Sequence, residues 1–321
     1  MASTSSSQGL FGVLNLHKPA GVTSREVVNT VQSLVRPNKV GHAGTLDPMA
    51  TGVLLVCVGR ATRLVSILQQ PSKSYRARFR LGQYSDTDDS TGNIRNVLPL
   101  QVISQEKIEK TLQEFCGVIE QIPPVYSAVK VQGQRAYTLA RQGSQVTLRA
   151  RPVRIDSIEL LNFHWPNITL DIQCGSGTYI RSIARDLGDR LGCGGLMTAL
   201  ERTRIGAFCL DDSVDVNRLT AANVIQNLLP AVQVTGHISQ YRCSETEQEI
   251  VSRGGSFDLQ KQRFQKQQLP ADQHELTGHP SVALLSDCGT QLLALAEIRK
   301  QGRRIQPRTV FTPDTNRQTE P

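Results

Sequence analysis

The segment at residues 73–81, KSYRARFRL, alternates between two kinds of side chain, and this alternation strongly limits how the segment can fold. Apolar residues occupy the odd-numbered positions from 75 to 81, and arginines occupy the even-numbered positions between them. The apolar set is Tyr75, Ala77, Phe79 and Leu81, and the arginines are Arg76, Arg78 and Arg80. Because successive side chains of a strand point to opposite faces, the segment predicts a half-buried strand with an exposed face of arginines.

Other segments predict helices and further strands around it. Residues 24–35 carry apolar side chains at helical spacing, preceded by a Thr23–Glu26 capping box and stopped by Pro37. A second helix is expected within 175–192, where apolar residues again form one stripe. Strands are expected at 11–16, 146–163 and 167–174, and a short helix at 108–115. The apolar run at 53–59 fits a buried strand or the edge of a buried helix, since periodicity cannot separate the two.

The length and the weaker patterning after residue 230 predict one large domain followed by a small one. We expect a disordered lead-in at 1–10, a large domain at 11–230, a small domain at 235–310 and a disordered tail at 311–321. No apolar run approaches the roughly 20 residues that span a bilayer. The opening MASTSSSQ has neither the basic nor the apolar region of a secretory signal.

Cysteine and histidine usage argues against a metal centre. The seven cysteines and six histidines are dispersed, without a C-x-x-C pair or an H-x-x-x-H pair. An odd number of scattered cysteines indicates reduced thiols and predicts a cytoplasmic protein. We therefore expect no metal centre.

The positive charge is concentrated in three stretches. The net charge is +8, and 48–85 and 121–155 contain no acidic residue but several lysines and arginines, Lys73, Arg76 and Lys130 among them. A third cluster near the C-terminus comprises Arg299, Lys300, Arg303, Arg304 and Arg308. Each stretch alone could be a solvated face, but three together favour a surface that follows the phosphates of a nucleic acid.

The stretch GHAGTLDPMATG, residues 41–52, surrounds a single carboxylate, Asp47, with Gly41, Gly44, Pro48 and Gly52. Glycine and proline permit a tight and rigid loop. Such a loop suits a nucleophile or general base, which must be positioned before the substrate arrives. The alternative is that Asp47 caps a helix beginning at Pro48.

Two further residues are candidates for the same site. Tyr75 lies in an acid-free basic segment and could stack on a nucleobase, although an ordinary core position is the alternative. Arg181 lies near the start of the second expected helix, where the helix dipole disfavours a cation. A carboxylate partner would explain Arg181, but surface arginines are also common there.

Six blocks, in order and in spacing, resemble the bacterial tRNA pseudouridine synthase B (TruB) family. They are KPAGVTS (18–24), GHAGTLDPMATG (41–52), KSYRARFRLG (73–82), PPVYSAVKVQGQRAY (123–137), GTYIRSIARDLG (177–188) and LERTRIGAF (200–208). The resemblance covers about residues 11–230, and residues 235–310 carry no comparable motif. It implies that 11–230 form a catalytic domain with an α+β pseudouridine synthase fold, a mixed, mainly antiparallel sheet flanked by helices. It also implies that 235–310 form a small C-terminal β-rich (PUA-like) domain that binds RNA.

The resemblance also implies roles for particular residues. Asp47 matches the catalytic aspartate, Tyr75 the active-site tyrosine, and Arg181 the arginine that pairs with the aspartate. Positions around the base and the substrate are matched by Tyr179, Leu200, His42, Lys18 and Pro19, the last two in a motif that supports the site. The implied reaction converts a T-loop uridine of tRNA (conventional position 55) into pseudouridine by base flipping, without a metal or an organic cofactor. Separately, we expect a monomer that needs no obligatory protein partner.

Two other functions remain open for this scaffold. An RNA-binding protein without catalysis would not need Asp47, Tyr75 and Arg181 together. A guide-dependent pseudouridine synthase would be expected to carry basic extensions and docking surfaces, which the short N-terminus does not suggest.

Overall fold

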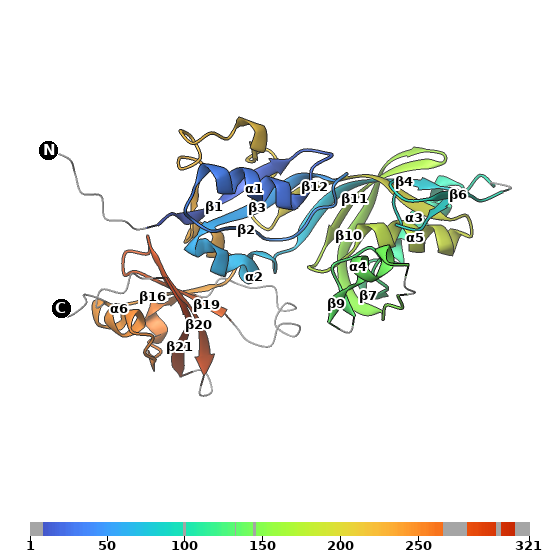
Figure 1. The fold of residues 1–321 in the computed structure, drawn as a ribbon. Coiled ribbons are helices and arrows are strands. Elements are labelled where there is room, and N and C mark those ends of the chain that lie inside the picture. Colours follow the sequence, from blue (N-terminus) through green and yellow to red (C-terminus); the bar gives the residue numbers. More distant parts are fainter. Residues whose placement is uncertain are drawn as a thin grey trace.

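The computed structural model describes residues 9–98, 101–131, 133–143, 146–265, 281–299 and 303–311. Most of the expected lead-in at 1–10, the tail after residue 311, and Lys300 of the C-terminal basic cluster lie outside these residues. The chain forms one large sheet with helices packed on it and a second, smaller sheet near the C-terminus (Figure 1).

The large sheet is mixed and mainly antiparallel, as predicted. Its main path runs β14 (Val214–Asp215), β1 (Phe11–Lys18), β3 (Thr51–Gly59), β12 (Gly195–Ile205), β4 (Lys73–Leu81), β11 (Asn167–Cys174), β10 (Arg151–His164) and β7 (Gly117–Gln121). The short strands β2 (Val40–His42), β13 (Phe208–Cys209) and β15 (Leu229–Pro230) pair with β3, β12 and β1. Among the described residues, the β1–β14 and β3–β12 neighbours are the parallel pairs of this sheet.

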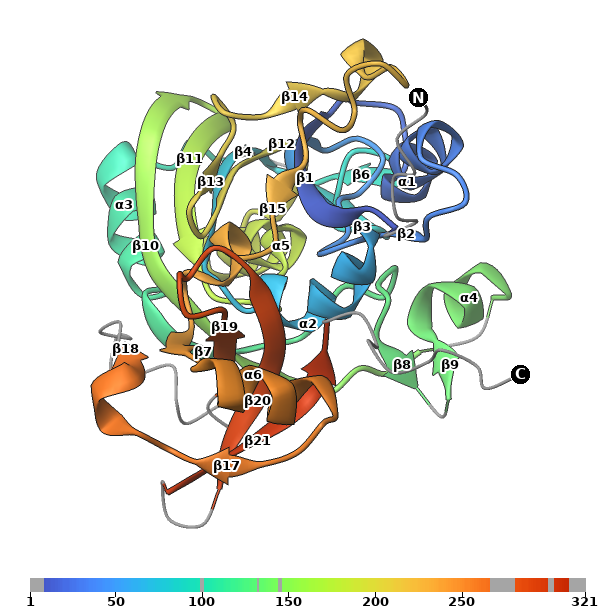
Figure 2. The same ribbon diagram turned by 90° about the vertical axis from the view of Figure 1, so that its left-hand side faces the viewer.

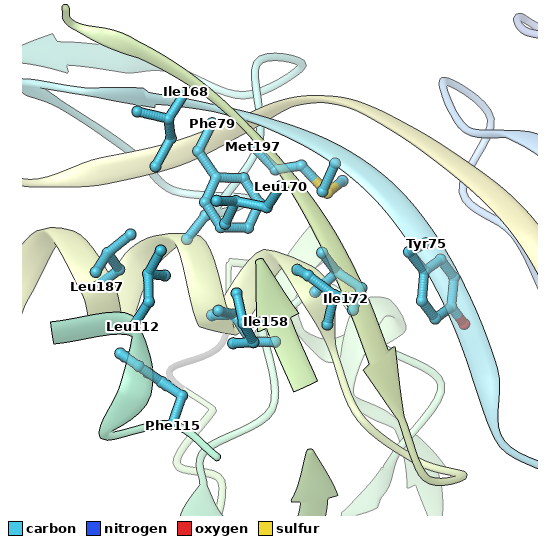
Figure 3. Close-up of a cluster of buried hydrophobic side chains, with 14 of the residues drawn as sticks. Tyr75, Phe79, Leu112, Phe115, Ile158, Ile168, Leu170, Ile172, Leu187 and Met197 are labelled. Atoms are coloured by element: carbon cyan, nitrogen blue, oxygen red, sulfur yellow. The ribbon is translucent and has the colours of Figure 1, made fainter. Parts of the chain in front are cut away.

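The strand at 73–81 forms as predicted, with alternate residues buried and exposed. Its apolar face packs with residues of β11 against helices α3 (Gln105–Gln113) and α5 (Ile180–Leu191). Figure 3 shows Phe79 and Leu170 pointing from the strands toward Leu112 and Leu187 of these helices. The side chains of Arg76, Arg78 and Arg80 therefore lie on the opposite face of the sheet.

At the other end of the sheet, α1 (Ser24–Leu34) packs on β1 and β3 with the predicted Thr23–Glu26 capping box. The 53–59 run, ambiguous by periodicity, lies within β3, buried almost throughout because both faces of this strand are covered. The remaining short elements are η1 (Arg60–Leu64), α2 (Val65–Leu68), α4 (Ala136–Arg141), η2 (Val216–Arg218), η3 (Gln233–Thr235), and the hairpins β5 (Gln83–Ser85)–β6 (Ile94–Asn96) and β8 (Lys130–Val131)–β9 (Gln134–Arg135).

The smaller sheet confirms the expected β-rich C-terminal region. Its order is β17 (Phe257–Asp258), β21 (Arg304–Val310), β20 (Leu292–Arg299), β19 (Ser281–Leu285), β16 (Ser239–Arg242) and β18 (Phe264–Gln265), accompanied by α6 (Glu245–Ser252) and η4 (Lys261–Arg263). This part packs directly on the large sheet (Figure 2). Phe311 stacks on Phe11 with ring centroids 5.0 Å apart, and Leu285 and Leu295 share a buried cluster with Leu55 of β3.

Several predicted boundaries differ from the structure. The helix expected at 108–115 spans Gln105–Gln113, and the strand expected at 11–16 continues to Lys18. The strand expected at 146–163 begins only at Arg151, because the pairing of β10 with β7 starts there, and 146–150 have no regular structure. The exact division of the chain into domains stays a prediction.

Candidate active site

Asp47 lies in the loop between β2 and β3, and its two flanks are anchored in the core. Leu46 and Ala50 are buried in the same cluster as Tyr75, whereas a third of the Asp47 side chain is exposed. A tight turn follows Asp47, with the Ala50 amide donating to the Asp47 carbonyl at 3.0 Å. No helix begins at Pro48, so the alternative interpretation of Asp47 as a helix cap is wrong.

The last residue of β1, Lys18, supports the Asp47 loop. The ammonium of Lys18, which is fully buried, donates to the carbonyls of Pro48 at 3.2 Å and of Ala50 at 2.6 Å, and to that of Pro19 at 2.9 Å. Burial lowers the pKa of Lys18 to about 8. Lys18 therefore supports the backbone on the C-terminal side of Asp47, which is the supporting role that the resemblance implies.

On the N-terminal side of Asp47, the first residue of α1 fixes the loop. The Ser24 hydroxyl lies 2.9 Å from the Leu46 amide and 3.1 Å from the Leu46 carbonyl. Because both peptide groups of a buried residue are satisfied by one side chain, Leu46 has little freedom to shift. The helix start thus positions the residue immediately before the carboxylate.

Two of the three glycines of the loop are required by the backbone. Gly44 and Gly52 have φ of 98° and 103°, values that favour glycine. A Cβ on Gly52 would lie 2.2 Å from the carbonyl oxygen of Arg202. Gly41 differs from the expectation, since it belongs to β2 and a Cβ there would make only an ordinary 3.7 Å contact with Thr62.

Arg181, in the first turn of α5, contacts the Asp47 carboxylate at two points. Its Nε lies 3.0 Å from Oδ2, and its Nη2 donates to Oδ1 at 3.2 Å. The same guanidinium donates to the carbonyls of Thr87 and Tyr126, each at 3.0 Å, and its side chain is only 7% exposed. A planar guanidinium used in this way fixes the orientation of a carboxylate as well as its charge.

The electrostatic environment of Asp47 contains opposing contributions. Burial raises the pKa of the carboxyl above its ordinary value, the Arg181 guanidinium opposes this rise, and the nearby Asp89 adds to it. Arg181 therefore favours the ionised carboxylate in a site where desolvation disfavours it.

The sequence analysis did not single out Asp89, which lies between β5 and β6. Its carboxylate lies 3.7 Å from Nη1 of Arg181 and is 6% exposed. The carboxylate accepts hydrogen bonds from the hydroxyls of Thr87 and Thr91, at 2.8 and 2.6 Å. The signal was present in the run TDDST, because threonines next to an aspartate can bond it locally, but nothing in the sequence placed this run against Arg181.

Tyr75 and Leu200 lie in the core cluster that flanks Asp47, and each is 8% exposed. Burial raises the pKa of the Tyr75 phenol, and the positive charge of the neighbouring Arg202 opposes this rise. Both residues face the covered side of the sheet, and Figure 3 shows Tyr75 at the end of the cluster remote from Phe79.

Tyr179 and His42 lie at the edges of this region. Tyr179 precedes α5, exchanges two hydrogen bonds with the Gln121 amide at 2.8 and 3.1 Å, and has Arg151 over its ring at 5.0 Å. His42 ends β2, and burial lowers the pKa of its imidazole. Its Nδ1 is buried and has no hydrogen-bond partner among the described residues.

The three basic residues expected to contact substrate occupy different settings. Lys73 is 7% exposed and donates to the Pro71 carbonyl at 2.7 Å and to that of Gln69, so its geometry favours a structural position instead of a phosphate contact. Arg76 lies on the open face, 4.0 Å from Glu201. Lys130 is exposed at the start of β8.

Comparison with known proteins decides the family. A model described as TruB family pseudouridylate synthase (N terminal domain) matches residues 32–180, and one for the tRNA pseudouridylate synthase B C-terminal domain matches 181–233. The chain belongs to the TruB family of pseudouridylate synthases. The two matches together include Asp47, Tyr75 and Arg181.

Individual relatives agree with the TruB assignment. The chain is 47% identical over 212 residues to tRNA pseudouridine synthase B of Mycobacterium tuberculosis H37Rv, covering 65% of this chain and 71% of the relative. It is 44% identical over 259 residues to the protein of the same name from Dehalococcoides mccartyi CBDB1, covering 79% and 86%. A solved Cbf5–Nop10–Gar1 complex contains a chain similar to it with a TM-score of 0.72 and 27% identity, covering 95% of this chain and 86% of that one.

The described residues contain no group of three or more histidine, cysteine or acidic side chains that could hold a metal ion. In the same residues, no helix is long and apolar enough to cross a membrane.

Proposed function

We propose that this TruB-family chain isomerises the T-loop uridine of tRNA, conventional position 55, to pseudouridine, with Asp47 as the catalytic carboxylate. The observation that carries the proposal is the two-point contact between Arg181 and Asp47 on a loop that the backbone and Lys18 hold rigid. RNA binding alone would not need a carboxylate oriented in this way.

The reaction breaks the N1–C1′ bond of uridine, rotates the released uracil, and joins C5 to C1′. The Asp47 carboxylate can attack C1′, attack C6 of the base, or promote loss of the C2′ proton, and each route needs it ionised and aimed. Arg181 supplies both conditions through its charge and its planar geometry. One carboxylate suffices here, in contrast to the pair that most glycosidases use.

The uridine must leave the folded T-loop to reach Asp47, so we propose that the base is flipped into the site. Tyr75 and Leu200 provide the buried apolar surface next to the Asp47 loop, and Tyr179 and His42 provide its edges. The exposed Arg76 and Lys130 are the basic residues whose positions fit RNA contacts, whereas Lys18, Pro19 and Lys73 support the backbone.

The decisive experiment uses Asp47→Asn, which keeps the shape of the side chain but removes its negative charge. Pseudouridine mapping of unmodified tRNA should show robust conversion by the parent protein and a rate lower by on the order of a thousandfold or more in the variant. Binding of tRNA should remain nearly unchanged. Asp212→Asn is the matched control, since Asp212 is an exposed aspartate in the turn between β13 and β14. Conversion by Asp47→Asn at the parent rate would end the catalytic assignment.

A guide-dependent reaction is the second candidate, because the Cbf5 chain with a similar fold is found with Nop10 and Gar1. We propose instead that this chain acts as a monomer, without a protein or guide RNA partner, on the T-arm. The test mixes the purified chain with unmodified tRNA and no other component. Formation of pseudouridine in this mixture excludes a requirement for a guide RNA or a protein partner. A cytoplasmic location stays a prediction.

A further inference from the structure

A groove of about 590 Å³ lies on the open face of the large sheet, away from the catalytic loop. Its floor is formed where β4, β11, β10 and β12 lie side by side, and its polar lining includes Arg78, Arg80, Asn162, His164, Asn167 and Thr198. None of the residues that line it is acidic. Because side chains alternate along β4, Arg78 and Arg80 point away from the face that carries Tyr75 and Phe79.

The cross-strand register explains why this groove is positive. Arg76 is opposite Asp171 on β11 and Glu201 on β12, so acidic neighbours flank it on both sides. Arg78 is opposite Thr169 and Ala199. One pleat further, Arg80 is opposite Asn167 and Leu196, and Asn167 in turn is opposite His164 on β10.

The charge of the open face therefore changes along a single strand. Among the described residues, neither Arg78 nor Arg80 forms an ion pair, while Arg76 lies 4.0 Å from Glu201. Keeping two like charges two residues apart without a counter-ion is unfavourable in the free protein, and an anionic ligand would relieve it. The amide and hydroxyl groups around them can donate hydrogen bonds to further oxygens of the same ligand.

We propose that this groove, which we call the outer-face groove, binds phosphates of the RNA backbone at a part of tRNA outside the arm that enters the active site. The proposal rests on the proposed function. The groove opens on the face opposite to Tyr75, so an isolated T-arm seated at Asp47 does not reach it, whereas a whole tRNA has additional backbone to follow the protein surface. Arginine with polar neutral neighbours is the combination that commonly contacts phosphate oxygens.

The test compares two substrates with the variant Arg78→Gln/Arg80→Gln. The matched control is Lys107→Gln/Lys110→Gln, which removes two positive charges from the exposed surface of α3 on the other side of the sheet. Equilibrium binding is measured over a range of salt concentrations, once with full-length unmodified tRNA and once with a T-arm stem-loop. Single-turnover conversion at saturating protein is measured for both.

For full-length tRNA we expect the groove variant to bind about fivefold more weakly, with a plot of log affinity against log salt that is shallower by about one to two units. For the stem-loop we expect the groove variant to have the same affinity and the same salt slope as the parent. The control variant should match the parent in both quantities with both substrates. An equal loss with both substrates, an equal loss in the control, or no loss with either substrate overturns the proposal.

Free inorganic phosphate separates a nucleic-acid site from a simple anion site. The parent protein is measured again with full-length tRNA in the presence of millimolar inorganic phosphate. If its salt slope then becomes as shallow as that of the groove variant, the groove binds small anions and the RNA assignment falls. The saturating conversion rate distinguishes this proposal from the proposed function: if the parent forms no pseudouridine, the catalytic assignment fails, while the binding comparison still decides the groove.

Discussion

The guanidinium of Arg181 meets the carboxylate of Asp47 edge to edge, with Nε 3.0 Å from Oδ2 and Nη2 3.2 Å from Oδ1. The two residues are 134 positions apart in the chain, and each is fixed independently. Asp47 is mounted between Leu46 and Ala50, whereas Arg181 is held by the Thr87 and Tyr126 carbonyls. The orientation of the carboxylate is therefore built into the folded chain before any RNA binds.

Removing the charge of Arg181 should shift the pH dependence of the reaction. In the parent, Arg181 lowers the pKa of Asp47 against the rise caused by burial, so Arg181→Met should raise that pKa further. Since the carboxylate must be ionised, the acid limb of the single-turnover rate should move to higher pH, by roughly one unit or more. Arg181→Lys keeps the charge but loses the planar fork, so we expect a slower rate with a smaller shift. An acid limb at the parent position in Arg181→Met would contradict this account.

A methyl group on Gly52 should disrupt the loop that positions Asp47. The added Cβ of Gly52→Ala would lie 2.2 Å from the Arg202 carbonyl at a φ of 103°, so we expect a loss of roughly 3 kcal/mol or more in the free energy of unfolding. The control is Gly192→Ala, at a φ of 70° with open space around the Cβ, which should cost only about 1 kcal/mol. Denaturant unfolding measures both, and equal losses would show that the contact with Arg202 is unimportant.

The buried Lys73 should make stability depend on pH above neutrality. Burial lowers the pKa of Lys73 to about 8 from its ordinary value of 10.5, so between these two values the unfolded chain binds more protons than the folded chain. Stability contributed by Lys73 therefore rises with pH across this interval. Relative to Lys73→Met, the parent should gain roughly 2 kcal/mol in unfolding free energy between pH 8 and 10. Chemical denaturation at both pH values tests this, and a difference independent of pH would be inconsistent with a depressed pKa.

The C-terminal basic cluster should contribute to tRNA binding through Arg303. Arg303 is exposed, whereas Arg304 donates to the Ser256 hydroxyl at 2.8 Å and to its carbonyl at 3.2 Å. We expect Arg303→Ala to weaken tRNA binding and to reduce the salt slope by about one unit. The double variant Arg303→Ala/Arg304→Ala should in addition lose stability, because an anchor of β21 is removed.

Filter binding over a range of salt concentrations measures the effect of Arg303→Ala, with Lys110→Ala on α3 as the single-charge control. An unchanged salt slope would remove Arg303 from the interface. A lower melting temperature for Arg303→Ala alone would point to a structural contribution instead.

Local patterns in the sequence were sufficient for several elements. The alternation at 73–81 and the Thr23–Glu26 capping box predicted β4 and the start of α1, because both depend on interactions between residues close in the chain. The crowding of glycine around Asp47 also indicated a special loop, although Gly41 proved to be an ordinary strand residue.

What the tertiary structure decided are the relationships between distant segments. The 53–59 run became a strand because both of its faces are covered by other parts of the chain, which no local period records. Asp89 joined Arg181 only because the loop between β5 and β6 packs against the start of α5. Likewise, the sequence alone determined that Arg76, Arg78 and Arg80 share a face, but the strands that flank β4 decided which arginines have acidic neighbours. Charge pairing across a sheet depends on register, and register is set by the whole fold.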